Sequence, residues 1–179
     1  MRVWDPLVRT LHWTLVAGVL TAWVTTKLQG ANAARLHEWA GYAVLAVVAL
    51  RLVWGCCGPR YARFAQFVRG PAYTLAYAKQ VAAHAEPRHI GHNPLGAWMI
   101  VALLVCAALA SATGWLCTTD RFWGIEWVER LHDVLAHALL ALAALHVAGA
   151  IFASWRHREN LPVAMLSGNK RAPQPGDVT

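Results

Sequence analysis

Four histidines lie within long apolar stretches of the chain, where an ionisable side chain is costly and usually serves a function: His12, His37, His132 and His146. An imidazole nitrogen can bind haem iron or zinc, or it can carry a proton. His132 and His146 are fourteen residues apart, so on an α-helix they share one face and are separated by about 21 Å along the axis. Small or apolar residues stand between them on that face and leave room for a flat, bulky group: Ala136, Leu139 and Ala143.

Four long apolar runs must position these histidines. They cover about residues 7–26, 37–57, 95–117 and 132–155, and each is close to the 20 or so residues that a membrane-spanning helix needs. Of the 179 residues, 58% are apolar and 14% are charged, whereas an average soluble domain carries about 25% charged residues. Only helices and closed barrels span lipid, and uninterrupted runs are not the alternating pattern of barrel strands. The sequence therefore predicts an all-α integral membrane protein, a four-transmembrane-helix bundle.

The distribution of charge predicts the orientation of the helices. With the N-terminus inside, twelve of the sixteen Lys and Arg residues fall on the cytoplasmic side, and four fall outside. Most of the ten Trp residues also lie near the ends of the runs, as in interfacial belts. We therefore expect a multi-pass protein of a cytoplasmic (inner) membrane with both termini cytoplasmic. The same asymmetry accounts for the net charge of +7, so we expect no nucleic-acid partner.

Two further segments are expected on the cytoplasmic side. Residues 58–94 connect the second and third spans, and residues 71–85 within them predict an interfacial helix with Pro71 at its first position. Residues 167–179 have the composition of a disordered cytoplasmic tail. The transmembrane domain is therefore expected to comprise residues 1–166.

This topology arranges the four histidines in two pairs. The first span begins inside, so His12 is level with His146, and the second begins outside, so His37 is level with His132. Each pair could offer two imidazoles converging between helices, as six-coordinate haem iron requires. Gly41 follows His37 by one helical turn and leaves similar clearance. The pattern predicts two haem groups.

Other chemistries fit the sequence less well. A structural zinc site needs four ligands together, whereas these pairs are about four turns apart. A proton relay usually includes membrane carboxylates, but Glu38 and Asp133 stand at the outer ends of their runs. A histidine-based proton or metal transporter without haem nevertheless stays an alternative. His137 should face away from the pair on its own helix, and His92 could contribute near the inner cofactor or a quinone. No Cys-x-x-Cys-His run is present, which excludes covalent c-type haem.

Several motifs together resemble the bacterial cytochrome b561 family. They are Val3-Trp4-Asp5-Pro6, Leu11-His12-Trp13, His37-Glu38-Trp39-Ala40-Gly41-Tyr42, Arg51-Leu52-Val53-Trp54-Gly55, Gly91-His92-Asn93-Pro94-Leu95 and the His132/His146 spacing. That family includes the b-type cytochrome subunits of nickel-iron hydrogenases and resembles the cytochrome b subunit of formate dehydrogenase. The likeness covers about residues 2–168.

The resemblance implies that His12 and His146 hold an inner haem and that His37 and His132 hold an outer haem. It also implies an electron-transfer subunit that connects a periplasmic redox partner, such as a c-type cytochrome, with ubiquinone or menaquinone. The alternative within such relatives is a superoxide:quinone oxidoreductase. The outer loops are shorter than in the hydrogenase subunits and identify no dedicated partner, and both a homodimer and a larger redox complex are compatible with the sequence.

Four arginines are candidate counter-charges for the anionic haem propionates. Arg9 and Arg51 stand near the expected inner haem, and Arg35 and Arg130 stand near the outer one.

Overall fold

A computed structural model describes residues 1–178, which contain seven α-helices and one 3-10 helix. In chain order the elements are α1 (Pro6–Thr25), α2 (Ala31–Cys57), η1 (Arg60–Ala62), α3 (Phe64–Phe67), α4 (Pro71–Ala82), α5 (Pro94–Cys117), α6 (Glu126–Arg156) and α7 (Leu161–Ser167). The described part of the chain contains no strand, as the all-α prediction requires.

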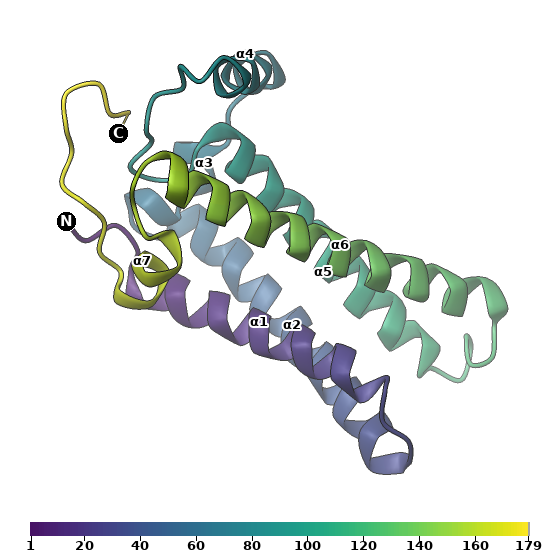
Figure 1. The fold of residues 1–179 in the computed structure, drawn as a ribbon. Helices are drawn as coiled ribbons and strands as arrows, with labels where there is room; N and C mark the ends of the chain where they lie inside the picture. Colours follow the sequence, from purple (N-terminus) through teal and green to yellow (C-terminus); the bar gives the residue numbers. More distant parts are fainter. Residues whose placement is uncertain (179) are drawn as a thin grey trace. The chain divides into compact units, whose positions relative to one another are not determined.

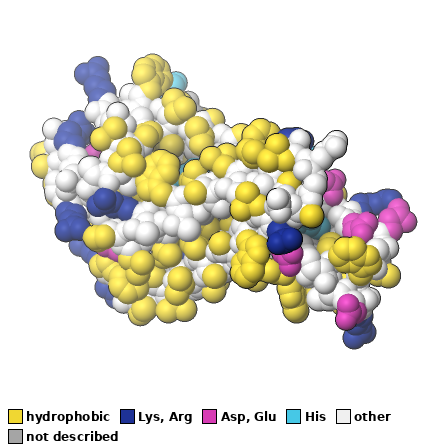
Figure 2. Space-filling model, turned by 90° about the horizontal axis from the view of Figure 1, so that it is seen from below, with side chains coloured by type: hydrophobic (Ala, Val, Ile, Leu, Met, Phe, Trp, Pro, Cys, Tyr) yellow, Lys and Arg dark blue, Asp and Glu magenta, His cyan; other side chains and the backbone are white. Residues whose placement is uncertain are grey.

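The four predicted spans correspond to α1, α2, α5 and α6, which are long and apolar enough to cross a membrane. Large apolar side chains are exposed along all four helices, and Figure 2 shows hydrophobic side chains over much of the visible surface. Lipid requires no burial of such side chains within the protein, so this surface suits a membrane protein.

Two helices begin about two turns before the apolar runs that predicted them. α2 begins at Ala31 and α6 at Glu126. The first turn of α6 carries Glu126 and Glu129, whose negative charge stabilises a helix N-terminus. Polar residues can therefore extend a helix beyond its apolar part. As a result, His37 and His132 are each the seventh residue of their helix rather than near its first residue.

The chain divides into two compact units, and each contains parts of the long helices. One unit, which we call the hairpin unit, comprises Thr10–Leu52 and Leu103–Ala143. It holds the α1–α2 and α5–α6 connections and a core of small and branched side chains, including Val44, Val48 and Ala107. A side chain at Gly18 would lie 2.7 Å from Val44 Cγ2, so this glycine allows α1 to pack closely against α2.

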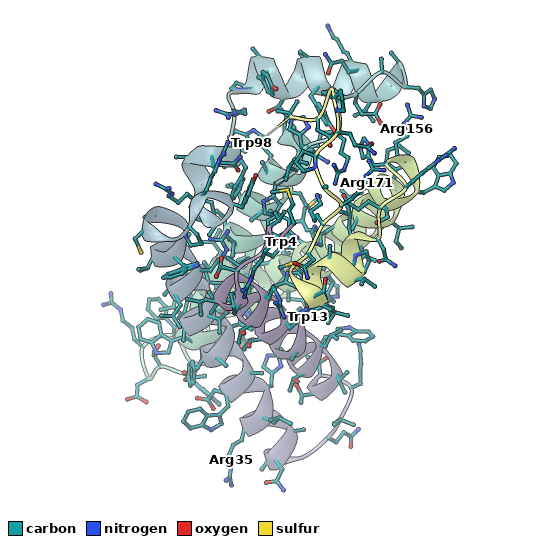
Figure 3. All side chains as sticks on the ribbon, turned by 90° about the vertical axis from the view of Figure 1, so that its left-hand side faces the viewer. Trp4, Trp13, Arg35, Trp98, Arg156 and Arg171 are labelled. Atoms are coloured by element: carbon teal, nitrogen blue, oxygen red, sulfur yellow. The ribbon has the colours of Figure 1, made fainter. Side chains whose placement is uncertain are left out.

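The other unit, which we call the terminal unit, comprises Met1–Arg9, Val53–Ala102 and the chain from Ala144 onward. Its core is built by Val3, Trp4, Ile90 and Ala164, which are almost fully buried. The N-terminal segment is bonded to the residues that follow α7, because the backbone N–H groups of Val3 and Trp4 donate to the Gly168 carbonyl at 2.9 and 3.1 Å. Figure 1 shows α7 beside the start of the chain, and Figure 3 shows Trp4 in the interior of this unit.

A buried ion network contacts the residues after α7, the segment whose composition predicts a disordered tail. Arg88 donates to Glu159 at 2.7 Å and to Asp177 at 2.5 Å, and Lys170 lies 3.4 Å from Glu159. The Val178 N–H also donates to the Arg88 carbonyl at 2.8 Å. These partners are far from the tail in sequence, so its polar composition does not reveal them.

The segment predicted as an interfacial helix at 71–85 forms α4, which ends at Ala82, and its interfacial position stays a prediction. His84 has a φ of 57°, a left-handed conformation that cannot continue an α-helix. The sequence did not predict α7, which begins where the Asn160 side chain accepts a hydrogen bond from the Val163 N–H at 3.0 Å and ends at Gly168 with a φ of 83°.

Candidate functional site

His37 and His132 face each other within the hairpin unit. Their ring centres are 6.2 Å apart and their planes are nearly perpendicular, at 88°. His37 comes from α2 and His132 from α6, so two helices far apart in sequence supply the pair. Both rings are partly buried.

The orientation of the His37 ring is set by the last turn of α1. Its Nδ1 atom lies 2.8 Å from the Ala22 carbonyl oxygen and 3.3 Å from Thr25 Oγ1. A carbonyl oxygen can only accept a hydrogen bond, so Nδ1 carries the proton and donates it. In a neutral imidazole the other nitrogen, Nε2, then keeps its lone pair and is available as a metal ligand.

His132 has the same arrangement on α5. Its Nδ1 atom lies 2.9 Å from the Ala110 carbonyl oxygen and 3.3 Å from Thr113 Oγ1. The ring also lies against the α5 backbone at Gly114, where an added Cβ would be 2.9 Å from His132 Cε1. The absence of a side chain at position 114 is therefore required for this ring position.

The pair fits a bis-imidazole haem site. With each metal–nitrogen distance about 2 Å, two imidazoles on opposite sides of one ion have ring centres about 6 Å apart. The observed 6.2 Å agrees with this span, and both Nε2 lone pairs are available. No atom lies within 4 Å of the position that a Cβ on Gly41 would occupy, one turn beyond His37. Nowhere in residues 1–178 do three or more His, Cys, Asp or Glu residues gather as a metal site would require.

The other predicted pair is divided between the two units. His12 lies on α1 in the hairpin unit, and its ring contacts the Trp13 ring edge-on at 5.2 Å. His146 lies on α6 in the terminal unit and is partly buried. Gly149, one turn further, has no atom within 4 Å of its added Cβ, so the helix surface beside His146 offers clearance. The pairing of His12 with His146 stays a prediction.

The four candidate arginines have different surroundings. Arg51 on α2 is 6% exposed, and Arg9 donates to the Ser167 carbonyl at 3.2 Å. Arg35 is exposed on the first part of α2, and its side chain points away from the ribbon in Figure 3. Arg130 forms a 2.5 Å ion pair with Glu126 at the surface, so its charge is already balanced by a carboxylate.

Two further histidines show contrasting environments. His137 is exposed, and its Nδ1 atom lies 2.9 Å from the Asp133 carbonyl oxygen of its own helix. His92 instead packs in the terminal unit between the rings of Trp4 and Phe67, at 4.5 and 4.6 Å.

A small pocket of about 30 Å³ opens beside His92 in the terminal unit. It is lined by Gln66, Phe67, Arg69, Tyr73, His89, Gly91, His92, Pro94 and Val178. Burial lowers the pKa of His89, so this imidazole is neutral at physiological pH. Gln66 on α3, Tyr73 on α4 and His89 between α4 and α5 were not expected at a site, because no sequence motif connects these three short segments.

Sequence analysis also missed Thr25, Thr113 and Gly114. The two threonines stand in mainly apolar helices, three residues after an alanine in both cases. A polar residue inside a span was the available signal, and it was overlooked in favour of the ionisable histidines.

Comparison with known proteins gives one match. The family model for prokaryotic cytochrome b561 matches residues 3–168, a range that includes all four long helices and all four candidate haem ligands. Neither the curated proteins nor the solved structures include a match to this chain.

Proposed function

The chain belongs to the prokaryotic cytochrome b561 family of membrane b-type cytochromes in electron transfer, and we propose that it carries electrons across the bacterial cytoplasmic membrane through two haem b groups. His37 and His132 would hold the outer haem, and His12 and His146 would hold the inner one. Haem b, when bound, supplies a carrier that gains or loses one electron. The observation that carries the proposal is the facing of His37 and His132 at 6.2 Å with both Nδ1 atoms bonded to carbonyls.

These histidines are proposed to hold the haem iron and to take no part in a chemical reaction with a substrate. His37 and His132 would hold the haem iron between them, and the haem would supply one-electron chemistry without binding a substrate. The carbonyl bonds hold each ring in one orientation, which favours transfer of an electron with little rearrangement. An electron-transfer protein has this requirement, whereas a proton or metal transporter would need imidazoles that release their cargo.

Exchange with ubiquinone or menaquinone is proposed at the terminal unit, on the cytoplasmic side. Aromatic rings and polar groups line its pocket, but the volume of about 30 Å³ is well below the roughly 300–1,000 Å³ of a pocket that encloses a ligand, so the quinone proposal rests on the family resemblance. The neutral His89 and the packed His92 belong to this lining. Both termini are proposed to be cytoplasmic, because twelve of the sixteen Lys and Arg residues then lie on that side.

The electron donor or acceptor on the outer side is proposed to be a periplasmic protein such as a c-type cytochrome. Oxidation of superoxide would need free cations to attract the anion. The Arg130 charge is paired with Glu126, and Glu129 and Asp133 lie near it on α6. The charges on this part of α6 favour a protein partner, and the other three outer basic residues, Lys27, Arg35 and Arg121, keep superoxide oxidation as the alternative.

The test is a reduced minus oxidised visible spectrum of the detergent-purified chain, with haem extracted and quantified per chain. We expect about two haems per chain and a low-spin b-type spectrum. His132→Ala should remove one haem and leave the other, and His137→Ala is the matched control on the same helix. A chain without haem, or equal loss from both variants, would refute the proposal.

A further inference from the structure

The same pair of acceptors surrounds the Nδ1 atom of each facing histidine. On α1 these are the Ala22 carbonyl at 2.8 Å and the Thr25 hydroxyl at 3.3 Å from His37. On α5 the corresponding groups, Ala110 and Thr113, lie at 2.9 and 3.3 Å from His132. In both cases the threonine follows the alanine by three residues, so two separate helices present the same pair of hydrogen-bond acceptors to an imidazole.

Both threonine hydroxyls are buried and already donate to their own helix. Thr25 is 4% exposed, and its Oγ1 lies 2.8 Å from the carbonyl oxygens of Thr21 and Ala22. Thr113 is 7% exposed, and its Oγ1 lies 2.8 Å from the Leu109 oxygen and 3.0 Å from the Ala110 oxygen. The single hydroxyl hydrogen is thus used within the helix, and the oxygen lone pairs face the imidazole N–H.

Each Nδ1–H therefore has two acceptors, the carbonyl and the hydroxyl, in a three-centre hydrogen bond. When the carbonyl and hydroxyl oxygens accept this hydrogen bond, the ring becomes a stronger electron donor through Nε2. A stronger donor stabilises iron in its more positive, oxidised state, so the hydrogen bond lowers the reduction potential. Only the electron is exchanged, because Nδ1 keeps its proton in both states.

We propose that Thr25 and Thr113 are positioning residues that lower the reduction potential of the outer haem by sharing the Nδ1–H hydrogen bonds of His37 and His132. This inference rests on the proposed haem ligation. It adds residues outside the ligand set, and it explains why two of the few buried polar side chains stand beside these histidines.

The experiment is a potentiometric titration of the purified wild-type chain and of Thr25→Val and Thr113→Val, followed by absorbance. Valine keeps the branched shape but removes the hydroxyl, while the carbonyl bond retains the ring tautomer. We expect the ratio of reduced to oxidised outer haem at a fixed ambient potential to rise twofold to tenfold in each variant. A tenfold change corresponds to about 59 mV for one electron. The inner haem should not shift, and Thr25→Ser and Thr113→Ser should restore the wild-type potential.

Matched controls are Thr26→Val and Thr119→Val. Their hydroxyls donate to the carbonyls of Trp23 and Leu116, both at 2.7 Å. They therefore bond to their own backbone as Thr25 and Thr113 do, but at other positions of the chain. They should leave both potentials unchanged. An unchanged or lowered outer potential in both Thr25→Val and Thr113→Val would overturn the inference.

Haem content separates this inference from the proposed function. A wild-type chain without haem refutes the function itself, whereas two haems with unshifted potentials refute only the role of the threonines. If a valine variant loses the outer haem, the haem content of the alanine and serine variants at the same position is measured. Haem loss with alanine and retention with serine supports the hydroxyl, and loss with serine overturns it.

Discussion

Replacing Gly114 with alanine tests how closely His132 must pack against α5. The added Cβ would lie 2.9 Å from His132 Cε1 and 3.3 Å from its Nδ1. The ring cannot simply rotate away, because Nδ1 is bonded to Ala110 on the same helix at 2.9 Å. The ring must shift by several tenths of an ångström, which as overpacking costs about 1–3 kcal/mol. Since about 1.4 kcal/mol corresponds to a tenfold change in affinity, we expect outer-haem affinity to fall about fivefold to a hundredfold.

The assay for Gly114→Ala is haem titration of the purified apoprotein, followed by absorbance. We expect one of the two sites to weaken and the other to keep its affinity. Ser111→Ala, on the same helix, is the matched control and should bind both haems normally. Two sites of wild-type affinity in Gly114→Ala would refute the packing argument and the assignment of His132 as a ligand held by α5.

Three further predictions concern the clearance beside His37 and the buried charges of the terminal unit. Gly41→Ala should weaken haem binding without lowering apoprotein thermal stability, because its added Cβ meets no protein atom within 4 Å; a lower melting temperature would contradict this. Glu159→Gln should destabilise the fold by about 3–5 kcal/mol in chemical denaturation, because it breaks a buried ion pair with Arg88, whereas Glu126→Gln breaks an exposed pair and should cost less than about 1 kcal/mol. Burial raises the pKa of Glu159, but the Arg88 hydrogen bond and the Lys170 charge outweigh burial and hold this pKa below its ordinary value. The ionised Glu159 therefore stabilises the fold fully above the unfolded carboxyl pKa of about 4.3, and this stabilisation is lost as pH falls further. Melting temperatures between pH 6 and pH 3, in wild type and Glu159→Gln, test the sign: an equal decline in both would contradict it.

Local sequence was enough to determine the spanning helices and one face of α6. An apolar run of about 20 residues satisfies its backbone hydrogen bonds internally in lipid, so α1, α2, α5 and α6 follow from hydropathy alone. The spacing of His132 and His146 likewise follows from helical geometry. The family motifs led to the same family that the match over residues 3–168 shows.

The tertiary structure decided which groups surround the histidines and how the tail is held. His37 is bonded to Ala22 across fifteen residues, and His132 to Ala110 across twenty-two. Arg88 is bonded to Glu159 across seventy-one residues and to Asp177, in the tail, across eighty-nine. Hydropathy and helical periodicity describe one element at a time. Hydrogen bonds between elements depend on packing. The contacts of Thr25, Thr113 and Gly114 with the histidines therefore follow from the packing of α1 against α2 and of α5 against α6 within the hairpin unit.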